Sequence, residues 1–405
     1  MPVGATRVLV YEPDDTTPID VSNRTASVDV ERGRRSGLDP LRAGTATVTL
    51  RNDDGAFDPF DTGGSYYTDI RPGAKLVIQA AANPSSPTWR TLFTGRVESW
   101  RPGYGHRNRS VIRVDAVDGF AELTSMALPD WAPPQQAAGN RLIAMMALPA
   151  LAEFTWPQDI DSGATTVGAF PVAAGTSAFT YLQRVVRSEQ AQCFMSRAGT
   201  FTFRGRYDAL AASDLEFRHT ATGSATAPKV TVEITGIDAR ASFEDFANRV
   251  VTATEPGGDA NNTGEAFVNE DAASVGFHRR AQSLQMTDLV CATDRQADDL
   301  GKLILDRYGT GVFRVTSVET QAARFSTAVA DKLYQSEIGD LVRVVYRGPS
   351  GADYDETLRV VGISHQVTGR NEHRIRWHLS PDVSDTSGLF ILGSSSLDGP
   401  DVLGY

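Results

Sequence analysis

Two stretches far apart in the chain follow the same order of turns and strands, and this repetition limits the fold more than any other feature. The first, from Ile70 to Ala116, contains a glycine turn, a strand, a second apolar strand and a closing strand. The second, from Glu337 to Leu379, contains the same elements in the same order. The glycines that mark the turn and the second strand have similar spacings of 22 and 23 positions: Gly73 and Gly95, then Gly339 and Gly362. Two β-meanders on one plan predict a duplicated β-domain with other material between the copies.

The chain is long enough for several domains. Its 405 residues lead us to expect two to four of them, and 41% hydrophobic residues with 22% charged residues suffice for packed cores. A disordered chain is excluded by this composition. The formal net charge of -11 argues against a general nucleic-acid binder or a binder of anionic membranes, although it leaves room for a local basic groove.

Cysteine content and hydropathy indicate a protein that folds in a reducing cytosol. Cys193 and Cys291 are too few for a disulfide framework, and their surroundings predict two buried, reduced thiols. No apolar run follows the first residues, so we expect no signal peptide. The longest apolar stretch, 142–151, is interrupted by Pro149 and is too short to cross a bilayer. Stable membrane insertion is therefore not expected.

Pattern changes along the chain predict four segments. Residues 1–128 contain many short alternating strands and are expected to form an all-β barrel or sandwich. A proline-rich linker then introduces 129–228, whose helical spacing and hairpin signals predict a small α+β insert. Residues 229–380 return to β patterning, with one clear helix at 294–308 that begins with a capping box. Residues 381–405 are expected to be an extended tail whose apolar side chains dock on a neighbouring protein.

The residue types that carry chemistry do not converge in the sequence. His373 and His378 are five positions apart on one predicted strand, so their side chains point to opposite faces. His365 is placed to face His378 across adjacent strands, without a cysteine or carboxylate at ligand spacing. No HExxH, CxxC, GxSxG or Walker pattern occurs. The sequence therefore predicts no catalytic, cofactor-binding or metal-ligating residues, and a protein that is not an enzyme.

Three other stretches resemble known sites only in part. The run 52–55 with Asp58 lacks the alternating acidic spacing and the closing Glu of a calcium loop, which favours a hairpin turn. The carboxylates between Glu153 and Asp161 are of the types used by glycosidases, but nothing predicts a cleft around them. The loop 101–109 combines Tyr104 with three arginines, like a surface that contacts nucleic acid or glycan. An exposed hairpin tip explains that loop more simply.

Short motifs occur in a fixed order through both halves. The N-terminal motifs lie at 43–52 (AGTATVTLRN), 57–59 (FDP), 70–73 (IRPG), 92–97 (LFTGRV) and 115–119 (DAVDG). The C-terminal motifs lie at 248–250 (NRV), 297–308, 338–340 (IGD) and 362–365 (GISH). In order and spacing, over most of residues 1–380, the chain resembles the tail-tip or baseplate hub (minor tail) proteins of long-tailed phages that infect actinobacteria.

This resemblance implies a mainly β fold in which two tail-tube-like β-barrel domains are joined by a smaller helix-plus-hairpin domain. It also implies a homotrimer at the distal end of a siphovirus-like tail. Three chains with two barrels each would present six barrels, and so would adapt a sixfold tube to a threefold tip. The implied partners are the distal tail protein or tube ring, the tape measure protein, and tip or fibre proteins. DNA would pass through the lumen, for which we expect a polar, largely acidic lining.

Two other functions are compatible with the residues. A carbohydrate-binding adsorption protein would contact host cell-wall glycan through the Tyr104 loop or through the α+β insert. A cell-wall hydrolase is the third alternative. The chain lacks any evident peptidoglycan-cleaving or fibre domain, in which it departs from larger relatives of the resembled family.

Overall fold

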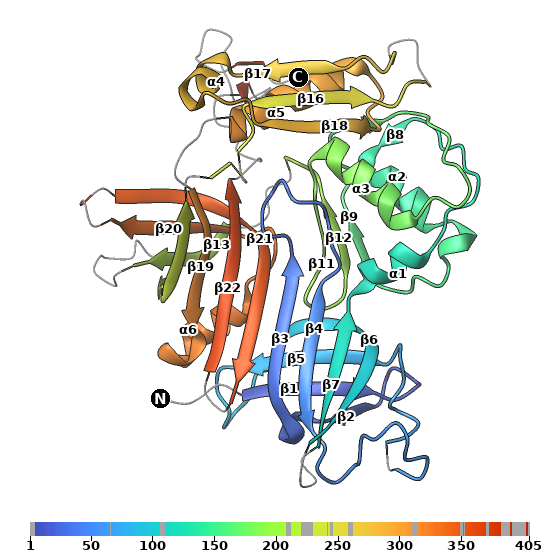
Figure 1. Cartoon of the computed structure of the whole chain (residues 1–405), viewed down its shortest axis with the longest axis vertical. Coiled ribbons are helices and arrows are strands. Elements are labelled where there is room, and N and C mark those ends of the chain that lie inside the picture. The colour runs from blue at the N-terminus through green and yellow to red at the C-terminus, as the bar shows by residue number, and fades with distance from the viewer. Residues whose placement is uncertain are drawn as a thin grey trace.

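A mixed β-sheet of fourteen strands dominates the computed structural model and runs through both halves of the chain. The structure describes residues 5–381 apart from 65, 106–109, 208–211, 220–229, 241, 244–245, 258–261, 310–313, 349–350, 352 and 370–371, and beyond 381 only two short strands. The fold is mainly β with several helices, as the sequence predicts. Smaller units cover the sheet at its upper end (Figure 1).

The N-terminal half contributes β1 (Ala5–Tyr11), β2 (Pro18–Asp20), β3 (Thr25–Gly33), β4 (Thr45–Arg51), β5 (Lys75–Ala81), β6 (Arg90–Tyr104) and β7 (Ser110–Val117). The C-terminal half contributes β13 (Ala212–Arg218), β14 (Val230–Glu233), β15 (Gly236–Arg240), β19 (Arg314–Gln321), β20 (Leu341–Arg347), β21 (Asp353–Thr368) and β22 (Glu372–Pro381). The short 3-10 helices η1 (Ser22–Arg24) and η4 (Ala322–Arg324) and the helix α6 (Thr327–Gln335) connect these strands.

The two halves repeat one arrangement of five antiparallel strands. Neighbouring strands follow the order β3-β4-β7-β6-β5 in the first half and β15-β19-β22-β21-β20 in the second. The turn before the meander is also repeated, because the Gly73 amide donates to the Val97 carbonyl at 2.7 Å and the Gly339 amide donates to the Val360 carbonyl at 2.7 Å. A β-bulge follows at once in both copies, after Val97 and after Val360. The predicted pair of meanders is therefore present.

One detail of the predicted repeat is wrong. The shared turn and bulge make Val97 equivalent to Val360, so Gly95 precedes the equivalent position by two residues and Gly362 follows it by two. These two glycines are unrelated, and each has its own close contact. A Cβ on Gly95 would lie 2.5 Å from the Phe93 ring, whereas one on Gly362 would lie 2.2 Å from the Arg34 carbonyl oxygen.

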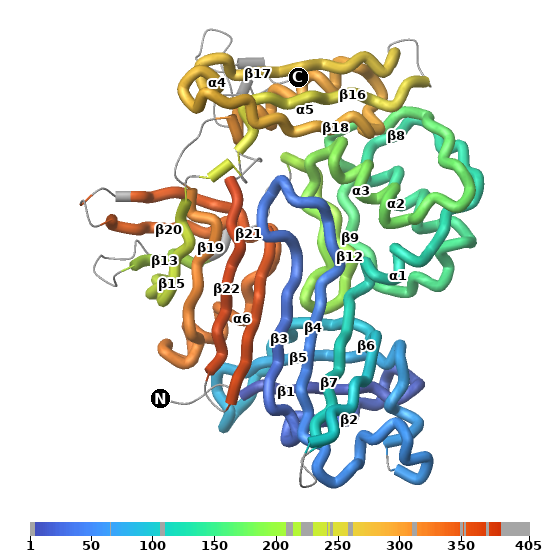
Figure 2. The backbone as a smooth tube through the Cα atoms, viewed as in Figure 1, coloured from blue at the N-terminus to red at the C-terminus, as the bar shows by residue number. Residues whose placement is uncertain are grey.

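The halves are joined edge to edge within the chain. Residues 27–33 of β3 pair antiparallel with residues 362–368 of β21, so that β3 lies between β4 and β21 (Figure 2). Gly33 faces Gly362 at the end of this ladder. Gly33 has φ +77°, and a Cβ there would lie 2.4 Å from the Val361 carbonyl oxygen, so the close approach of the two backbones requires glycine.

Both halves contribute to one hydrophobic core, which contains Val28, Leu50 and Ile112 from the first half and Phe217, Ile363 and Trp377 from the second. Alternation explains this, because β3, β4, β7 and β22 each present every second side chain to the core over most of their length. The outer strands differ between the halves: β1 pairs antiparallel with β5, while β13 pairs parallel with β20. The closed barrels expected from the sequence thus remain a prediction.

A second core belongs to the insert between the halves. It contains α1 (Gly119–Ser125), α2 (Ala138–Met146), η3 (Pro149–Leu151), α3 (Ala178–Glu189) and the strands β8 (Gln136–Ala137), β9 (Gln158–Ile160), β10 (Thr166–Val167), β11 (Gln192–Met195) and β12 (Phe201–Arg204). The predicted hairpin is β11–β12, and Gly199 in its turn has φ +84°. The insert begins earlier than predicted, since α1 buries Phe120 and Leu123 in this core. The strand β13, expected within the insert, instead joins the large sheet.

A third unit was not expected from the sequence. The strands β16 (Arg249–Thr254), β17 (Phe267–Glu270) and β18 (Ser283–Leu289) form a small sheet, covered by α5 (Asp294–Tyr308) and flanked by α4 (Ala272–His278). Its own core contains Val250, Leu289, Leu300 and Ile304. The predicted capping box of α5 is present in outline: Thr293 caps the Gln296 amide, and the Gln296 side chain accepts from the Ala292 amide at 3.0 Å. This unit interrupts the segment 229–380 that was expected to be one barrel domain.

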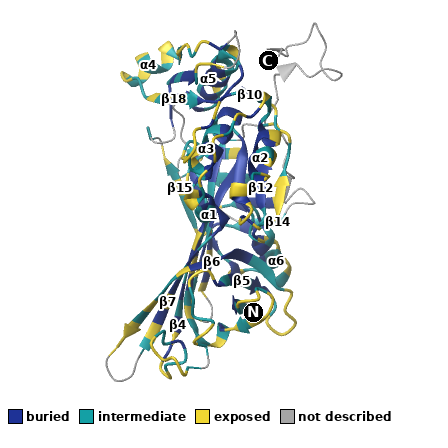
Figure 3. Ribbon diagram, turned by 90° about the vertical axis from the view of Figure 1, so that its right-hand side faces the viewer, coloured by how far each residue is buried: buried dark blue, intermediate teal, exposed yellow. Residues whose placement is uncertain are grey.

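Among the described residues, no helix is both long enough and apolar enough to span a membrane. Exposed side chains gather on α4 at the top and at the far ends of β4 and β7 (Figure 3). The predicted docking tail, 381–405, lies almost wholly outside the described residues. Only β23 (Leu389–Phe390) and β24 (Val402–Leu403) are described there, as a short parallel pair.

Candidate assembly surface

The large sheet has one apolar face on the core and one polar face toward solvent. Eight adjacent strands share this polar face, in the order β15, β19, β22, β21, β3, β4, β7 and β6. A hollow of about 590 Å³ lies on it, lined among others by Glu31, Glu319, Arg374 and Arg376. A continuous polar surface over both halves is the broadest surface that the fold offers to a partner or to a lumen.

The polar face carries charges of both signs in similar numbers, while the acidic lining expected for a lumen stays a prediction. Its carboxylates include Asp29, Glu31, Asp115, Asp238, Glu319 and Glu372, and its arginines include Arg51, Arg101, Arg113, Arg240, Arg374 and Arg376. Neighbouring groups form ion pairs, such as Arg376 with Glu319 at 2.7 Å and Arg113 with Asp115 at 2.9 Å. The net charge of -11 is therefore not concentrated on this face.

Glu337 joins three units of the molecule. Its carboxylate accepts from the Arg32 guanidinium of β3 at 2.7 Å and from the Arg197 amide of the insert at 3.0 Å. Arg32 is 2% exposed and lies next to the last residue of β3, with its side chain on the core side. The Arg197 side chain in turn donates to the carbonyls of Gln335 and Ser336. These contacts fix the insert against both halves of the sheet.

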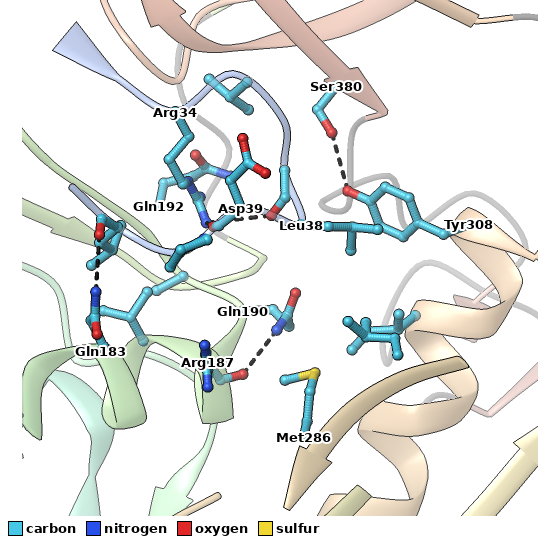
Figure 4. A pocket seen from close by; sticks show the side chains of 18 of the residues that line it. Arg34, Leu38, Asp39, Gln183, Arg187, Gln190, Gln192, Met286, Tyr308 and Ser380 are labelled. Atoms are coloured by element: carbon cyan, nitrogen blue, oxygen red, sulfur yellow. Dashed lines mark hydrogen bonds between the residues drawn. The ribbon is translucent and has the colours of Figure 1, made fainter. Parts of the chain in front are cut away.

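A small cavity of about 90 Å³ lies where the insert, the third unit and the loop 34–41 meet (Figure 4). Its polar side chains bond mainly to their surroundings: Gln183 donates to the Leu41 carbonyl at 2.9 Å, and the hydroxyls of Tyr308 and Ser380 lie 3.1 Å apart. Arg34 contacts the carbonyls of Gly37 and Asp39 at 3.4 Å each, and burial lowers its pKa. No nucleophile with an adjacent base lines this cavity, so its geometry indicates packing between units.

The histidines meet in a different pair from the one expected. Nδ1 of His365 lies 3.1 Å from Nε2 of His373, whereas His378 lies beside Ser364. The reason is register: His365 pairs with Ile375, so that His365 and His373 both point into the core. Burial lowers the pKa of His373 to about 4 and that of His365 well below its usual value. Within the described ranges, no group of three or more His, Cys, Asp or Glu residues could hold a metal ion.

The remaining sequence candidates have structural contacts. In the acidic turn, the Asn52 side chain accepts from the Phe57 amide at 2.8 Å and Asp54 pairs with Arg24 at 2.6 Å. That turn opens the long connection between β4 and β5, so it is not a hairpin turn. Asp159 and Asp161 both pair with Arg204, while Glu153 is exposed. No two of these three carboxylates face each other across a cleft.

The thiols and the tyrosine loop behave largely as predicted. Cys193 and Cys291 are both buried, and burial raises the pKa of Cys291 to about 11. Tyr104 ends β6 with 63% exposure, and its hydroxyl donates to Asp58 at 3.2 Å. Arg107 and Arg109 of the same loop lie outside the described residues.

No protein-family model matches the chain, and no curated protein matches it. Solved structures of tail proteins do share its fold. A tail protein from Neisseria meningitidis MC58 aligns with a TM-score of 0.63 and 12% identity, over 94% of this chain and 99% of that one. The 43 kDa tail protein of prophage MuSo2 from Shewanella oneidensis aligns with a TM-score of 0.59 and 13% identity, over 94% and 100%. Prophage tail protein gp18 from Listeria monocytogenes EGD-e gives 0.52 and 9%, over 92% and 94%.

These alignments cover 92–94% of the chain, so the likeness extends over most of the arrangement of sheet, insert and third unit. The fold class is therefore that of these prophage and bacterial tail proteins. At 9–13% identity the likeness concerns fold alone.

Proposed function

We propose that this chain is a structural tail protein of a phage or prophage, and that it forms a homotrimeric hub at the distal end of the tail. The observation that carries the proposal is the internal duplication. Two five-stranded units with the same strand order, turn and bulge lie edge to edge in one chain. Three such chains contain six equivalent units, which can match a sixfold tube ring on one side and a threefold tip on the other.

The fold shared with tail proteins supports the same proposal, since it extends over at least 92% of this chain in each comparison. In the proposed hub, the distal tail protein or tube ring lies on one side and tip or fibre proteins lie on the other, with the tape measure protein ending at the channel. The polar face would line that channel, where DNA passes in transit. Its balanced charges would give a phosphate backbone little net attraction.

The proposed role is architectural and requires no chemistry. Among the described residues, His365, His373 and both cysteines are buried, and His378 lies beside Ser364 on the polar face. Asp159 and Asp161 are paired with Arg204, and Glu153 is separately exposed. The protein would reside in the virion after folding in the host cytoplasm.

Two measurements test the proposal. The mass of the purified chain in solution, by light scattering or native mass spectrometry, is expected to correspond to three copies. Gold-labelled antibody against the chain is expected to bind at the distal end of tails in electron micrographs. A chain that remains monomeric in solution and labels elsewhere on the tail, or not at all, would refute the hub.

A further inference from the structure

Among the eight strands that share the polar face, β6 and β15 each have an edge without a strand neighbour among the described residues. The pairing of β3 with β21 inside the chain indicates what each of these two edges fits. The first half of β6, 90–96, pairs with β5, and its second half, 96–104, pairs with β7 on the opposite edge. Beyond the bulge, the β5-side edge of β6 is therefore unpaired. At the other end of the eight strands, β15 pairs with β19 on one edge only.

The equivalent edges are already paired with each other inside the chain. β21 corresponds to β6, and its residues 362–368 pair with 27–33 of β3. β3 corresponds to β15, because both occupy the end position of the five-strand order. One strand pairing between the repeated units, β21 with β3, is thus complete inside the chain. The two strands equivalent to this pair, β6 and β15, lie at opposite ends of the eight strands and do not pair with each other within the chain. We infer that β6 of one copy pairs antiparallel with β15 of the next copy, which deepens the proposed hub by assigning its subunit interface.

The register follows from the in-chain joint. The bulges make Ser99 equivalent to Gly362, and the ladders through β4 and β19 make Asp29 equivalent to Asp238. In the chain, Asp29 lies opposite Gln366. The corresponding positions are Gly103 in β6 and Asp238 in β15, which places Asp238 of the next copy opposite Gly103.

Charge and exposure agree with this register. Asp238 is exposed, and Arg101 and Arg113 beside Gly103 have side chains 66% and 57% exposed. A carboxylate arriving opposite Gly103 is a diagonal neighbour of Arg101, within reach of a long side chain. The same register places Arg240 of the next copy opposite Arg101. Asp115 offsets the repulsion between these two arginines, because its carboxylate lies 3.2 Å from the Arg101 guanidinium. Pro102 has no amide hydrogen and contributes only its carbonyl, which shortens the ladder by one donor.

Edge pairing also accounts for the exposed aromatic side chain at this place. Tyr104 is equivalent to Val367, which lies opposite Val28 and packs partly buried against the core. The corresponding partner of Tyr104 is Ile237 of the next copy. Their contact would cover an aromatic ring that is 63% exposed in the single chain.

Disulfide trapping in the full-length protein tests the interface. Directly opposed residues bring their Cβ atoms within about 4.5–5.5 Å, close enough for a disulfide after small adjustment. The double variant Gly103→Cys with Asp238→Cys is expected to give covalent dimers and trimers on non-reducing gels. Each single variant is expected to give none, and the native thiols are buried. Ser99→Cys with Asp238→Cys, four positions out of register, is also expected to give none.

The matched positive control is Asp29→Cys with Gln366→Cys. These two residues are the equivalents of Asp238 and Gly103 and lie opposite each other within one chain, so their disulfide is expected to form inside the chain. Oxidation is measured for all variants under conditions in which this control closes, together with the mass of the assembly. Trimers in which the Gly103–Asp238 pair stays reduced would overturn the proposed interface and leave the hub standing. A protein that is monomeric and uncrosslinked would overturn both.

Discussion

Removal of the Glu337 carboxylate is expected to destabilise the protein far more than removal of a surface carboxylate. Glu337 is the only charged acceptor within 4 Å of the Arg32 guanidinium among the described residues, at 2.7 Å. In Glu337→Ala the guanidinium, 2% exposed, would keep one contact, to the Met195 carbonyl at 3.4 Å. The Arg197 amide would lose its acceptor as well.

The expected magnitude follows from burial. Breaking a buried ion pair costs about 3–5 kcal/mol, because the remaining charge is left uncompensated. Glu337 itself has a side chain 22% exposed, so water can partly replace it. We therefore expect a loss of about 3 kcal/mol in the free energy of unfolding. Glu337→Gln, which keeps an acceptor oxygen without the charge, should lie between Glu337→Ala and the wild type.

Urea unfolding followed by tryptophan fluorescence measures this effect, since the buried Trp377 donates to Ser336 one residue from Glu337. The matched control is Asp54→Ala, which removes the ion pair between Asp54 and Arg24. The Asp54 side chain is 54% exposed, so this substitution is expected to cost less than about 1 kcal/mol. Equal urea midpoints for Glu337→Ala and Asp54→Ala would refute the assignment of Glu337 as the joint between units.

Three further predictions concern pH, backbone contact and the tail. Burial raises the pKa of Asp118 to about 7, so the folded state binds the proton of this carboxyl more tightly than the unfolded state, and the stability that it contributes falls as pH rises from about 4 to 7. Urea unfolding of Asp118→Asn between those pH values should show a smaller fall in the free energy of unfolding than the wild type. An equal fall in both proteins would contradict the prediction. Gly362→Ala would place a Cβ 2.2 Å from the Arg34 carbonyl oxygen and is expected to cost about 1–3 kcal/mol, measured by urea unfolding against Gly276→Ala, which has nothing within 4 Å. Truncation after Pro381 is expected to leave the melting temperature unchanged while lowering incorporation into tails, and equal incorporation would show that the tail has no docking role.

Local sequence patterns predicted the strands and several helices because their signals are local. Alternation marked β3, β4 and β14, helical spacing marked α3, and the capping box marked the start of α5. The repeated meander was visible because both copies preserve the turn and the strand pattern. The overall class of fold therefore followed from short windows of sequence.

Features that depend on distant residues were not predictable in this way. No local pattern around Arg32 indicates its burial, because the carboxylate that pairs with it belongs to Glu337, 305 residues later. The equivalence of Gly95 with Gly362 failed because the turn glycine and the bulge are 24 positions apart in the first copy, from Gly73 to Val97, and 21 apart in the second, from Gly339 to Val360. Similar glycine spacings therefore fall before the bulge in one copy and after it in the other. The helices α1, α4 and α6 are short, and a few residues carry too weak a periodicity to separate them from loops.

The antiparallel pairing of β3 with β21 has a consequence for how the chain is made. The partners Asp29 and Gln366, for example, are 337 positions apart along the chain. At synthesis rates of roughly 5–20 residues per second, the edge of β3 stays open on the ribosome for roughly 20–70 seconds before its partner emerges. An open strand edge can pair with other chains during that interval. The nascent chain is thus most exposed to aggregation after its N-terminal half has emerged and before β21 is made. Synthesis of fewer chains at a time, or chaperone binding in that interval, should raise the folded yield.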